Sequence, residues 1–210
     1  MRGIVVFDVD GTLFDTKEGI IKALNIVLEN NGMNQIQEKD EDEYIGPPIK
    51  YSLKKFYVLD DAEADKLVEE YRTYYIDHTI KESRLYVGTT ELIECLKLRG
   101  YSVGIATLKT YPQVHALLKY NNMLESFDII RTANAKGGVS KSDMLGQIRA
   151  VFKCDTDEFI FIGDTVGDFN AANEMDYKFI AADYGYGDVK MLECSHIDSI
   201  ESMLRVMKGK

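Results

Sequence analysis

The sequence lacks the long apolar runs and cysteine patterns that mark several classes of protein. No apolar run approaches the roughly 18 residues that a membrane-spanning helix requires, and the run at residues 4–7 is too short for a secretory signal peptide. The three cysteines form neither a CxxC pair nor a metal-binding Cys/His spacing. These absences exclude a membrane protein and a disulfide-stabilised secreted domain, and they favour a reducing cytoplasm.

Basic residues are also scarce, because 25 Lys and Arg face 35 Asp and Glu and leave a formal net charge of −10. Nucleic acids and anionic membranes need a basic surface, so neither is expected as a partner. Tryptophan is absent, but 13 Tyr and 9 Phe within a 45% hydrophobic composition can build a core. We therefore expect a cytoplasmic, acidic globular protein of one or two domains.

Short apolar segments bounded by turn residues alternate with amphipathic stretches along most of the chain. The expected strands are 4–7, 101–106, 127–130, 159–162 and 177–182. The expected helices between them are 90–98, 111–120, 141–152 and 168–175. Strands that alternate with helices of this length predict an α/β fold with a doubly wound parallel sheet.

Residues 16–84 interrupt this alternation. Segments 18–29 and 62–79 each place their apolar residues on one face of a helix, and no strand pattern accompanies them. An acidic run at 38–43 and the turn Gly46-Pro47-Pro48 lie between them. We expect residues 16–84 to form an inserted α-helical bundle, the cap, and residues 1–15 and 85–210 to form the core.

Asp8 and Asp10 follow the first expected strand, and Gly11 then allows a sharp turn. Strand alternation keeps both carboxylates on one side, at the carboxyl edge where open α/β sheets bind ligands. Clustered carboxylates repel one another unless a cation is present, and Mg²⁺ prefers oxygen ligands. An isolated pair of this kind could equally be a solvated turn before the next helix.

Asp164 and Asp168 follow the strand at 159–162 and open a helix. Taken alone, they are explained by helix capping from Asp164 and a favourable dipole interaction of Asp168. However, a second acidic pair at a second strand end would lie close to Asp8 and Asp10. The two pairs together predict a cation site.

Two further positions could bind an anion. Thr107 ends the second core strand, where its hydroxyl and the following N–H groups can hold phosphate oxygens or simply cap a helix. Lys141 opens a helix after a glycine-rich loop, although the helix dipole disfavours a cation there. Lys136 competes for the same role, and either lysine could be an ordinary surface residue.

In this order, these residues resemble the four motifs of the haloacid dehalogenase (HAD) superfamily. The matching positions are Asp8-Val9-Asp10-Gly11-Thr12-Leu13, Thr107, Lys141, and Asp164 with Asp168. Residues 46–49, 71–75 and 184–187 are similar to segments of the phosphoglycolate phosphatase-like subgroup. The resemblance covers nearly the whole chain, and it implies a Rossmann-like core with a helical cap that closes over the site.

The resemblance implies a Mg²⁺-dependent phosphomonoester hydrolase, phosphoglycolate phosphatase-like or 5'-nucleotidase-like, acting on a small phosphorylated metabolite. Asp8 would attack phosphorus to form an aspartyl-phosphate, and Asp10 would protonate the leaving oxygen and then deprotonate water. The metal would be held by Asp8, the Asp10 backbone carbonyl and Asp164, with Asp168 as a ligand or a neighbour of one.

The resemblance also assigns phosphate binding. Thr107 and the amide of Leu108 would bind phosphoryl oxygens, and Lys141 would neutralise charge near Asp8. Lys109 matches the lysine that commonly follows the second motif and is assigned to substrate binding. Leu108 replaces a residue that is usually polar, which removes one side-chain contact with the substrate.

Other functions remain open at this point. A β-phosphoglucomutase-like phosphotransferase would keep Asp8, Asp10 and the cap, whereas dehalogenase chemistry makes no use of Asp10. A phospho-accepting signalling domain carries its acceptor in mid-chain and needs no cap. A non-catalytic Mg²⁺- or phosphate-binding module would tolerate loss of the acids. The substrate and the choice between monomer and homodimer are not fixed by the sequence.

Overall fold

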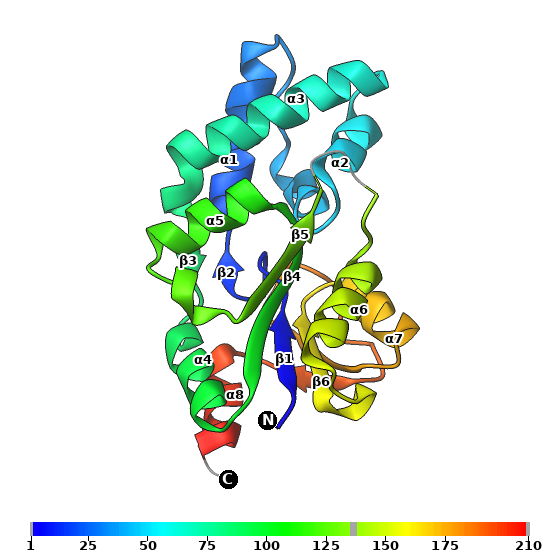
Figure 1. The fold of residues 1–210 in the computed structure, drawn as a ribbon. Coiled ribbons are helices and arrows are strands. Elements are labelled where there is room, and N and C mark those ends of the chain that lie inside the picture. Colours follow the sequence, from blue (N-terminus) through cyan, green and yellow to red (C-terminus); the bar gives the residue numbers. More distant parts are fainter. Residues whose placement is uncertain (1, 135–137, 209–210) are drawn as a thin grey trace.

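The computed structural model describes residues 2–134 and 138–208 and contains a six-stranded, all-parallel sheet in the order β5-β4-β1-β6-β7-β8 (Figure 1). The strands are β1 (Ile4–Phe7), β4 (Ser102–Thr110), β5 (Ile129–Ala133), β6 (Phe159–Gly163), β7 (Lys178–Ala182) and β8 (Ser195–Ile197). The doubly wound sheet predicted from the sequence is confirmed. β8 was not expected, because this short edge strand includes the exposed, polar Ser195 and His196 and forms no apolar run.

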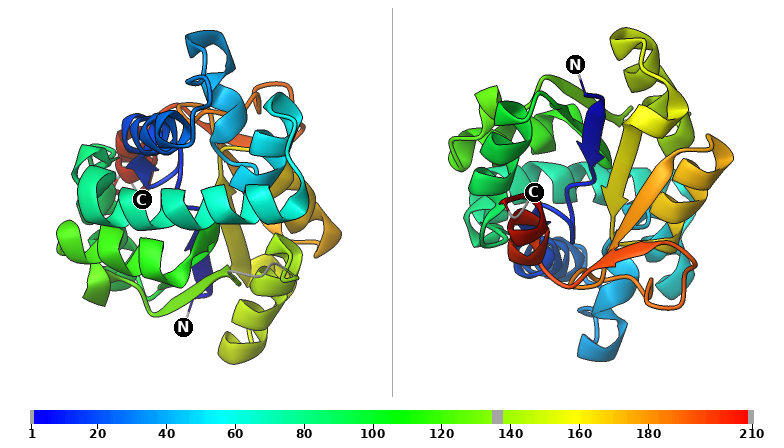
Figure 2. Two further views of the ribbon diagram at one scale, coloured as in Figure 1. Left: turned by 90° about the horizontal axis from the view of Figure 1, so that it is seen from above. Right: turned by 90° about the horizontal axis from the view of Figure 1, so that it is seen from below.

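β1 lies at the centre of the sheet, and its side chains alternate between two layers of helices. Val5 and Phe7 pack into the cluster with α4 (Thr89–Leu98) and α5 (Tyr111–Tyr120). Ile4 and Val6 pack against α6 (Lys141–Phe152) and α7 (Val166–Glu174) on the opposite face. Helix α8 (Ile200–Lys208) lies beside α4, and Figure 2 shows helices on both sides of the sheet. Burial on both faces explains why β1 is a continuous apolar run.

The helices of the insertion lie beyond the carboxyl edge of the sheet (Figure 1). They are α1 (Lys17–Asn30), α2 (Ile49–Phe56) and α3 (Asp61–Tyr74), with the short turns η1 (Glu38–Tyr44), η2 (Tyr75–Thr79) and η3 (Ile80–Glu82). The helix expected at 62–79 is present, but its last part, from Tyr75 to Thr79, is a π-helical turn that directly follows α3. Helix α2 was not predicted, because three of its eight residues are lysines and the apolar residues that remain do not show a helical period.

A two-stranded antiparallel ribbon joins the sheet to the helices above it. β2 (Phe14–Asp15) pairs with β3 (Arg84–Leu85), so the outgoing and returning segments of the chain run side by side. The expectation that residues 16–84 contain no strand is wrong at Arg84, because a two-residue strand has no periodic pattern to detect. The ribbon is the only antiparallel pairing between named strands in the described part of the chain.

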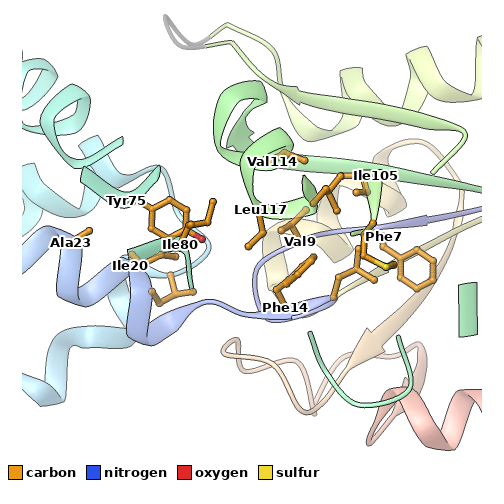
Figure 3. Close-up of a cluster of buried hydrophobic side chains, with 14 of the residues drawn as sticks. Phe7, Val9, Phe14, Ile20, Ala23, Tyr75, Ile80, Ile105, Val114 and Leu117 are labelled. Carbon is orange, nitrogen blue, oxygen red and sulfur yellow. The ribbon is translucent and has the colours of Figure 1, made fainter. Parts of the chain in front are cut away.

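One apolar cluster continues from the sheet into the insertion (Figure 3). At the sheet end Phe7 lies beside Ile105, and at the helical end Ile20 lies beside Tyr75 and Ile80. This shared core supports the cap directly over the carboxyl ends of the strands. Within residues 2–134 and 138–208, no helix combines the length and apolar character required to cross a membrane.

Candidate active site

Three buried carboxylates meet where β1 and β6 end. Asp8 follows β1, while Asp164 and Asp168 follow β6, and one oxygen of each lies within 4.8 Å of the others. The strands are direct neighbours, with Phe7 in register with Ile162, so their carboxyl ends bring the acids together. Of the four acids expected at this edge of the sheet, the structure brings Asp8, Asp164 and Asp168 together, whereas the Asp10 side chain is not part of this group.

Local hydrogen bonds fix the two acids after β6. The Asp164 carboxylate accepts from the Thr12 hydroxyl at 3.1 Å and from the Tyr186 backbone N–H at 2.9 Å. Asp168 forms a capping box with Thr165, whose hydroxyl and N–H donate to Asp168 Oδ2 at 2.6 and 3.1 Å. Thr165, and not Asp164, therefore caps α7, which leaves the Asp164 side chain directed at the cluster.

Lys141 supplies a cation to this cluster from the first turn of α6. Its Nζ lies 3.1 Å from Asp8 Oδ1 and also contacts Asp168 Oδ1. Burial lowers the pKa of Lys141, but the charges of Asp168 and Asp8 outweigh burial and raise it, so the ammonium stays charged. Lys136, the alternative candidate, lies outside the described residues.

The cluster carries more negative charge than Lys141 can balance. Burial raises the pKa of Asp8, and the Asp168 and Asp10 charges add to this effect against Lys141. Burial and the charges of Asp168 and Asp8 raise the pKa of Asp164 to about 8. Lys141 Nζ, which Asp8 Oδ1 shares with Asp168 Oδ1, is a single positive charge beside three carboxylates. Three buried oxygen donors with excess negative charge suit a hard divalent cation.

The side chain of Asp10 has different partners from the other acids. Its Oδ1 accepts a hydrogen bond from the Thr16 hydroxyl and lies 2.9 Å from Lys109 Nζ. Lys109 is buried, and its Nζ stands 4.7 Å from the ring centre of Tyr75 in η2. Lys109, assigned from the sequence to substrate binding, thus connects Asp10 to the cap. This pairing was not predicted, because the two residues are far apart along the chain.

Thr107 is buried in β4, the strand next to β1. β4 does not end at Thr107 as expected but continues to Thr110, with an irregular register between these residues. Helix α5 begins at Tyr111 as expected, with a capping box between Thr110 and Gln113, so the strand continues up to the start of the helix. The hydroxyl of Thr107 accepts from the Lys109 N–H at 3.3 Å, so the segment that includes Leu108 folds back on Thr107.

The loop after β7 was noted in the sequence only as similar to a segment of related phosphatases, and its place beside the acidic cluster was not predicted. A Cβ on Gly185 would lie 2.2 Å from the Asp164 Cβ, and a Cβ on Gly187 would lie 2.2 Å from the Asp164 carbonyl oxygen. Only glycine lets the backbone approach Asp164 so closely. The alternating glycines of Tyr184-Gly185-Tyr186-Gly187 were the available signal, although they do not reveal which residue they approach.

Comparison with known proteins places this arrangement in a family. A family model described as haloacid dehalogenase-like hydrolase matches residues 5–182. A phosphoglycolate phosphatase of Agrobacterium fabrum is 27% identical over 197 residues, covering 90% of this chain and 84% of the relative. A pyrophosphatase PpaX of Bacillus cereus is 30% identical over 175 residues, covering 81% and 80%. A 5'-nucleotidase of Pseudomonas aeruginosa is 26% identical over 184 residues, covering 87% and 83%.

A solved structure agrees with this placement. The crystal structure of a predicted phosphatase from Clostridium acetobutylicum is similar to this chain with a TM-score of 0.89 and 25% identity over 99% of both chains. A doubly wound sheet, a helical cap and buried acids at two strand ends define a Rossmann-like α/β enzyme. The chain belongs to the haloacid dehalogenase-like hydrolase family. Within it, the chain is an enzyme similar to the phosphatases.

Proposed function

We propose that the protein is a Mg²⁺-dependent phosphomonoester hydrolase that acts on a small phosphorylated metabolite through an aspartyl-phosphate on Asp8. The observation that carries this proposal is the contact of Lys141 with Asp8 inside the cluster of Asp8, Asp164 and Asp168. Phosphatase names among the relatives support the reaction class.

The donor set fits a magnesium ion. Asp8, Asp164 and the backbone carbonyl of Asp10 would hold it, with Asp168 as a further ligand or as the partner that orients Lys141. When bound, Mg²⁺ would neutralise the phosphoryl charge and fix the orientation of the group that is transferred. The raised pKa values of Asp8 and Asp164 support this assignment, because they describe a site that lacks positive charge.

In the proposed first step, a carboxylate oxygen of Asp8 forms a bond to phosphorus while the bond from phosphorus to the ester oxygen breaks. Asp10 gives its proton to that leaving oxygen. In the second step Asp10 takes a proton from water, the water oxygen attacks phosphorus, and the bond from phosphorus to Asp8 breaks to release phosphate. Thr16 and Lys109 support these roles by holding the Asp10 side chain apart from the other acids.

Phosphate recognition falls to neutral and cationic groups at the edge of the cluster. Thr107 and the amide of Leu108 bind phosphoryl oxygens, and Lys141 offsets the negative charge that accumulates near Asp8. Lys141 and a bound Mg²⁺ together would supply the local positive charge that lets a protein of net charge −10 bind an anion. Lys109 Nζ lies 2.9 Å from Asp10 Oδ1, and it would act on the substrate by holding the Asp10 carboxylate in place.

The relatives carry names that refer to three different substrates, so the proposal stops at the class of compound. Phosphoglycolate, 5'-nucleotides and pyrophosphate are the first compounds to test. We further propose that the enzyme works in the cytoplasm as a monomer or homodimer. Residues 1–15 and 85–210 would form the catalytic core and residues 16–84 the cap.

The test is a phosphate-release assay over a panel of small phosphorylated compounds with wild type and Asp8→Asn. The matched control is Asp188→Asn, which makes the same chemical change at an exposed acid. We expect release by wild type and by the control, loss of release in Asp8→Asn, and loss in EDTA that Mg²⁺ reverses. Undiminished release by Asp8→Asn would disprove the nucleophile, and interconversion of glucose phosphates without release would favour the phosphotransferase.

A further inference from the structure

The start of helix α1 lacks its ordinary N-cap interaction. Thr16 is the N-cap residue of α1, and an N-cap hydroxyl usually accepts from backbone N–H groups in the first turn. Here the Thr16 hydroxyl donates to Asp10 instead, and the structure shows no side-chain cap from Thr16. The first N–H groups of this helix therefore need an acceptor from elsewhere.

Tyr186 provides that acceptor from the far end of the sequence. Its phenol oxygen accepts from the Thr16 N–H at 2.7 Å and from the Lys17 N–H at 3.0 Å. The same hydroxyl donates to Asp15 Oδ1 at 2.6 Å. One oxygen thus binds three consecutive residues at the point where the chain leaves the β2–β3 ribbon and enters the cap.

The backbone of Tyr186 is bound to the acidic cluster at the same time. Its N–H donates to Asp164 Oδ2 at 2.9 Å, and Gly185 and Gly187 on either side lie in close contact with Asp164. The neighbouring Tyr184 hydroxyl donates to the Thr12 carbonyl at 2.8 Å and fastens the loop to the segment after β1. This loop therefore has little freedom to move relative to Asp164.

We propose that Tyr186 is a positioning residue that couples the first turn of the cap to Asp164, so that the cap is held over the acidic cluster. Its hydroxyl fixes the start of α1, and its main chain fixes Asp164. Its catalytic consequence rests on the proposed phosphatase function, whereas the mechanical coupling does not. Burial and the hydrogen bond to Asp15 raise the pKa of Tyr186, so the phenol remains a donor at neutral pH.

Tyr186→Phe separates the two halves of this coupling. The variant removes the phenol oxygen and with it the three contacts to residues 15–17, but it keeps the N–H that binds Asp164. We expect the cap to spend less time in its closed position, and the apparent affinity for substrate falls with the closed fraction. KM for phosphoglycolate or p-nitrophenyl phosphate should rise severalfold while kcat changes by less than about twofold. The stabilisation by Mg²⁺ should equal that of wild type.

The direct test is amide hydrogen exchange at Thr16 and Lys17 in the full chain. Tyr57→Phe is the matched control, because its hydroxyl donates at 2.8 Å to the Asn34 carbonyl within the cap and not to any of residues 15–17. Loss of the two N–H bonds should speed exchange at Thr16 and Lys17 by about tenfold in Tyr186→Phe and leave it unchanged in Tyr57→Phe.

Two results would overturn the proposal. Exchange at Thr16 and Lys17 equal to wild type in Tyr186→Phe would remove the coupling itself. A fall in kcat at constant KM would place Tyr186 in the chemical step instead of in cap positioning. Because exchange needs no substrate, an inactive wild type would reject the phosphatase function and the catalytic consequence of Tyr186, while the exchange rates would still decide the coupling.

Discussion

Replacing Asp164 by Asn should stabilise the metal-free protein, although the change affects a buried and hydrogen-bonded side chain. The pKa of Asp164 rises from the ordinary 3.8 to about 8 on folding. At pH 7 the folded state therefore keeps a proton that the unfolded state has released. Each pKa unit corresponds to 1.36 kcal/mol, so this proton costs the folded state about 4 kcal/mol at pH 7.

Asparagine avoids this cost because it does not ionise. Its amide can still accept from the Thr12 hydroxyl, but the acceptor for the Tyr186 N–H is lost, which costs about 1–3 kcal/mol. The metal-free variant should therefore gain roughly 1–3 kcal/mol, and a domain of this size responds by about 2–4 °C in Tm per kcal/mol. With Mg²⁺ the order reverses, because wild type gains binding energy that the variant loses.

The pH dependence has a defined sign. Between pH 4 and pH 8 the folded metal-free protein binds more protons at Asp164 than the unfolded chain does, so its stability falls as the pH rises through this window. Asp164→Asn should flatten that slope. The assay is thermal unfolding in EDTA and in Mg²⁺ at several pH values, with Asp188→Asn as the exposed control. An equal loss of Tm with and without metal would refute the reasoning.

Three further substitutions test the surroundings of the cluster. Gly185→Ala should weaken the Mg²⁺-induced rise in Tm, because the added Cβ would lie 2.2 Å from the Asp164 Cβ. Gly167→Ala is the control and should leave that rise unchanged, because its added Cβ would have no neighbour closer than 3.5 Å. Lys141→Met should abolish phosphate release. It should also destabilise the metal-free protein by about 3 kcal/mol in urea unfolding, because it leaves buried carboxylates unpaired. Phosphate release and stability equal to those of wild type would contradict the role of Lys141. Lys109→Met should lower kcat severalfold, because Lys109 Nζ lies 2.9 Å from Asp10 Oδ1 and holds that carboxylate in place, and an unchanged kcat would show that Lys109 does not act on that acid.

The sequence predicted those parts of the site that depend on backbone position. Asp8 and Asp164 each follow a buried apolar run, and parallel strands bring such ends together, so their proximity follows from the fold class alone. Lys141 was chosen over Lys136 only through the resemblance to the HAD motifs, because its position at the start of a helix after a glycine-rich loop left both lysines open. These inferences needed no knowledge of side-chain direction.

Contacts that depend on side-chain direction could not be predicted. Lys109 contacts Asp10, and the Tyr186 hydroxyl binds the start of α1. Neither contact produces a pattern in the sequence around these residues. Short elements such as β8 and α2 were missed for a related reason. They contain too few apolar residues to show a period and are stabilised by their neighbours in the fold.

The central claim is that Asp8 becomes phosphorylated during turnover. The measurement is mass spectrometry of the peptide that contains Asp8 from Asp10→Asn, quenched in acid during reaction with substrate and Mg²⁺. We expect a phosphoryl group on Asp8 that accumulates in Asp10→Asn, because the base that activates water is missing, and that is absent in EDTA. Phosphate release by wild type with no phosphoryl group on Asp8 under any of these conditions would contradict the account.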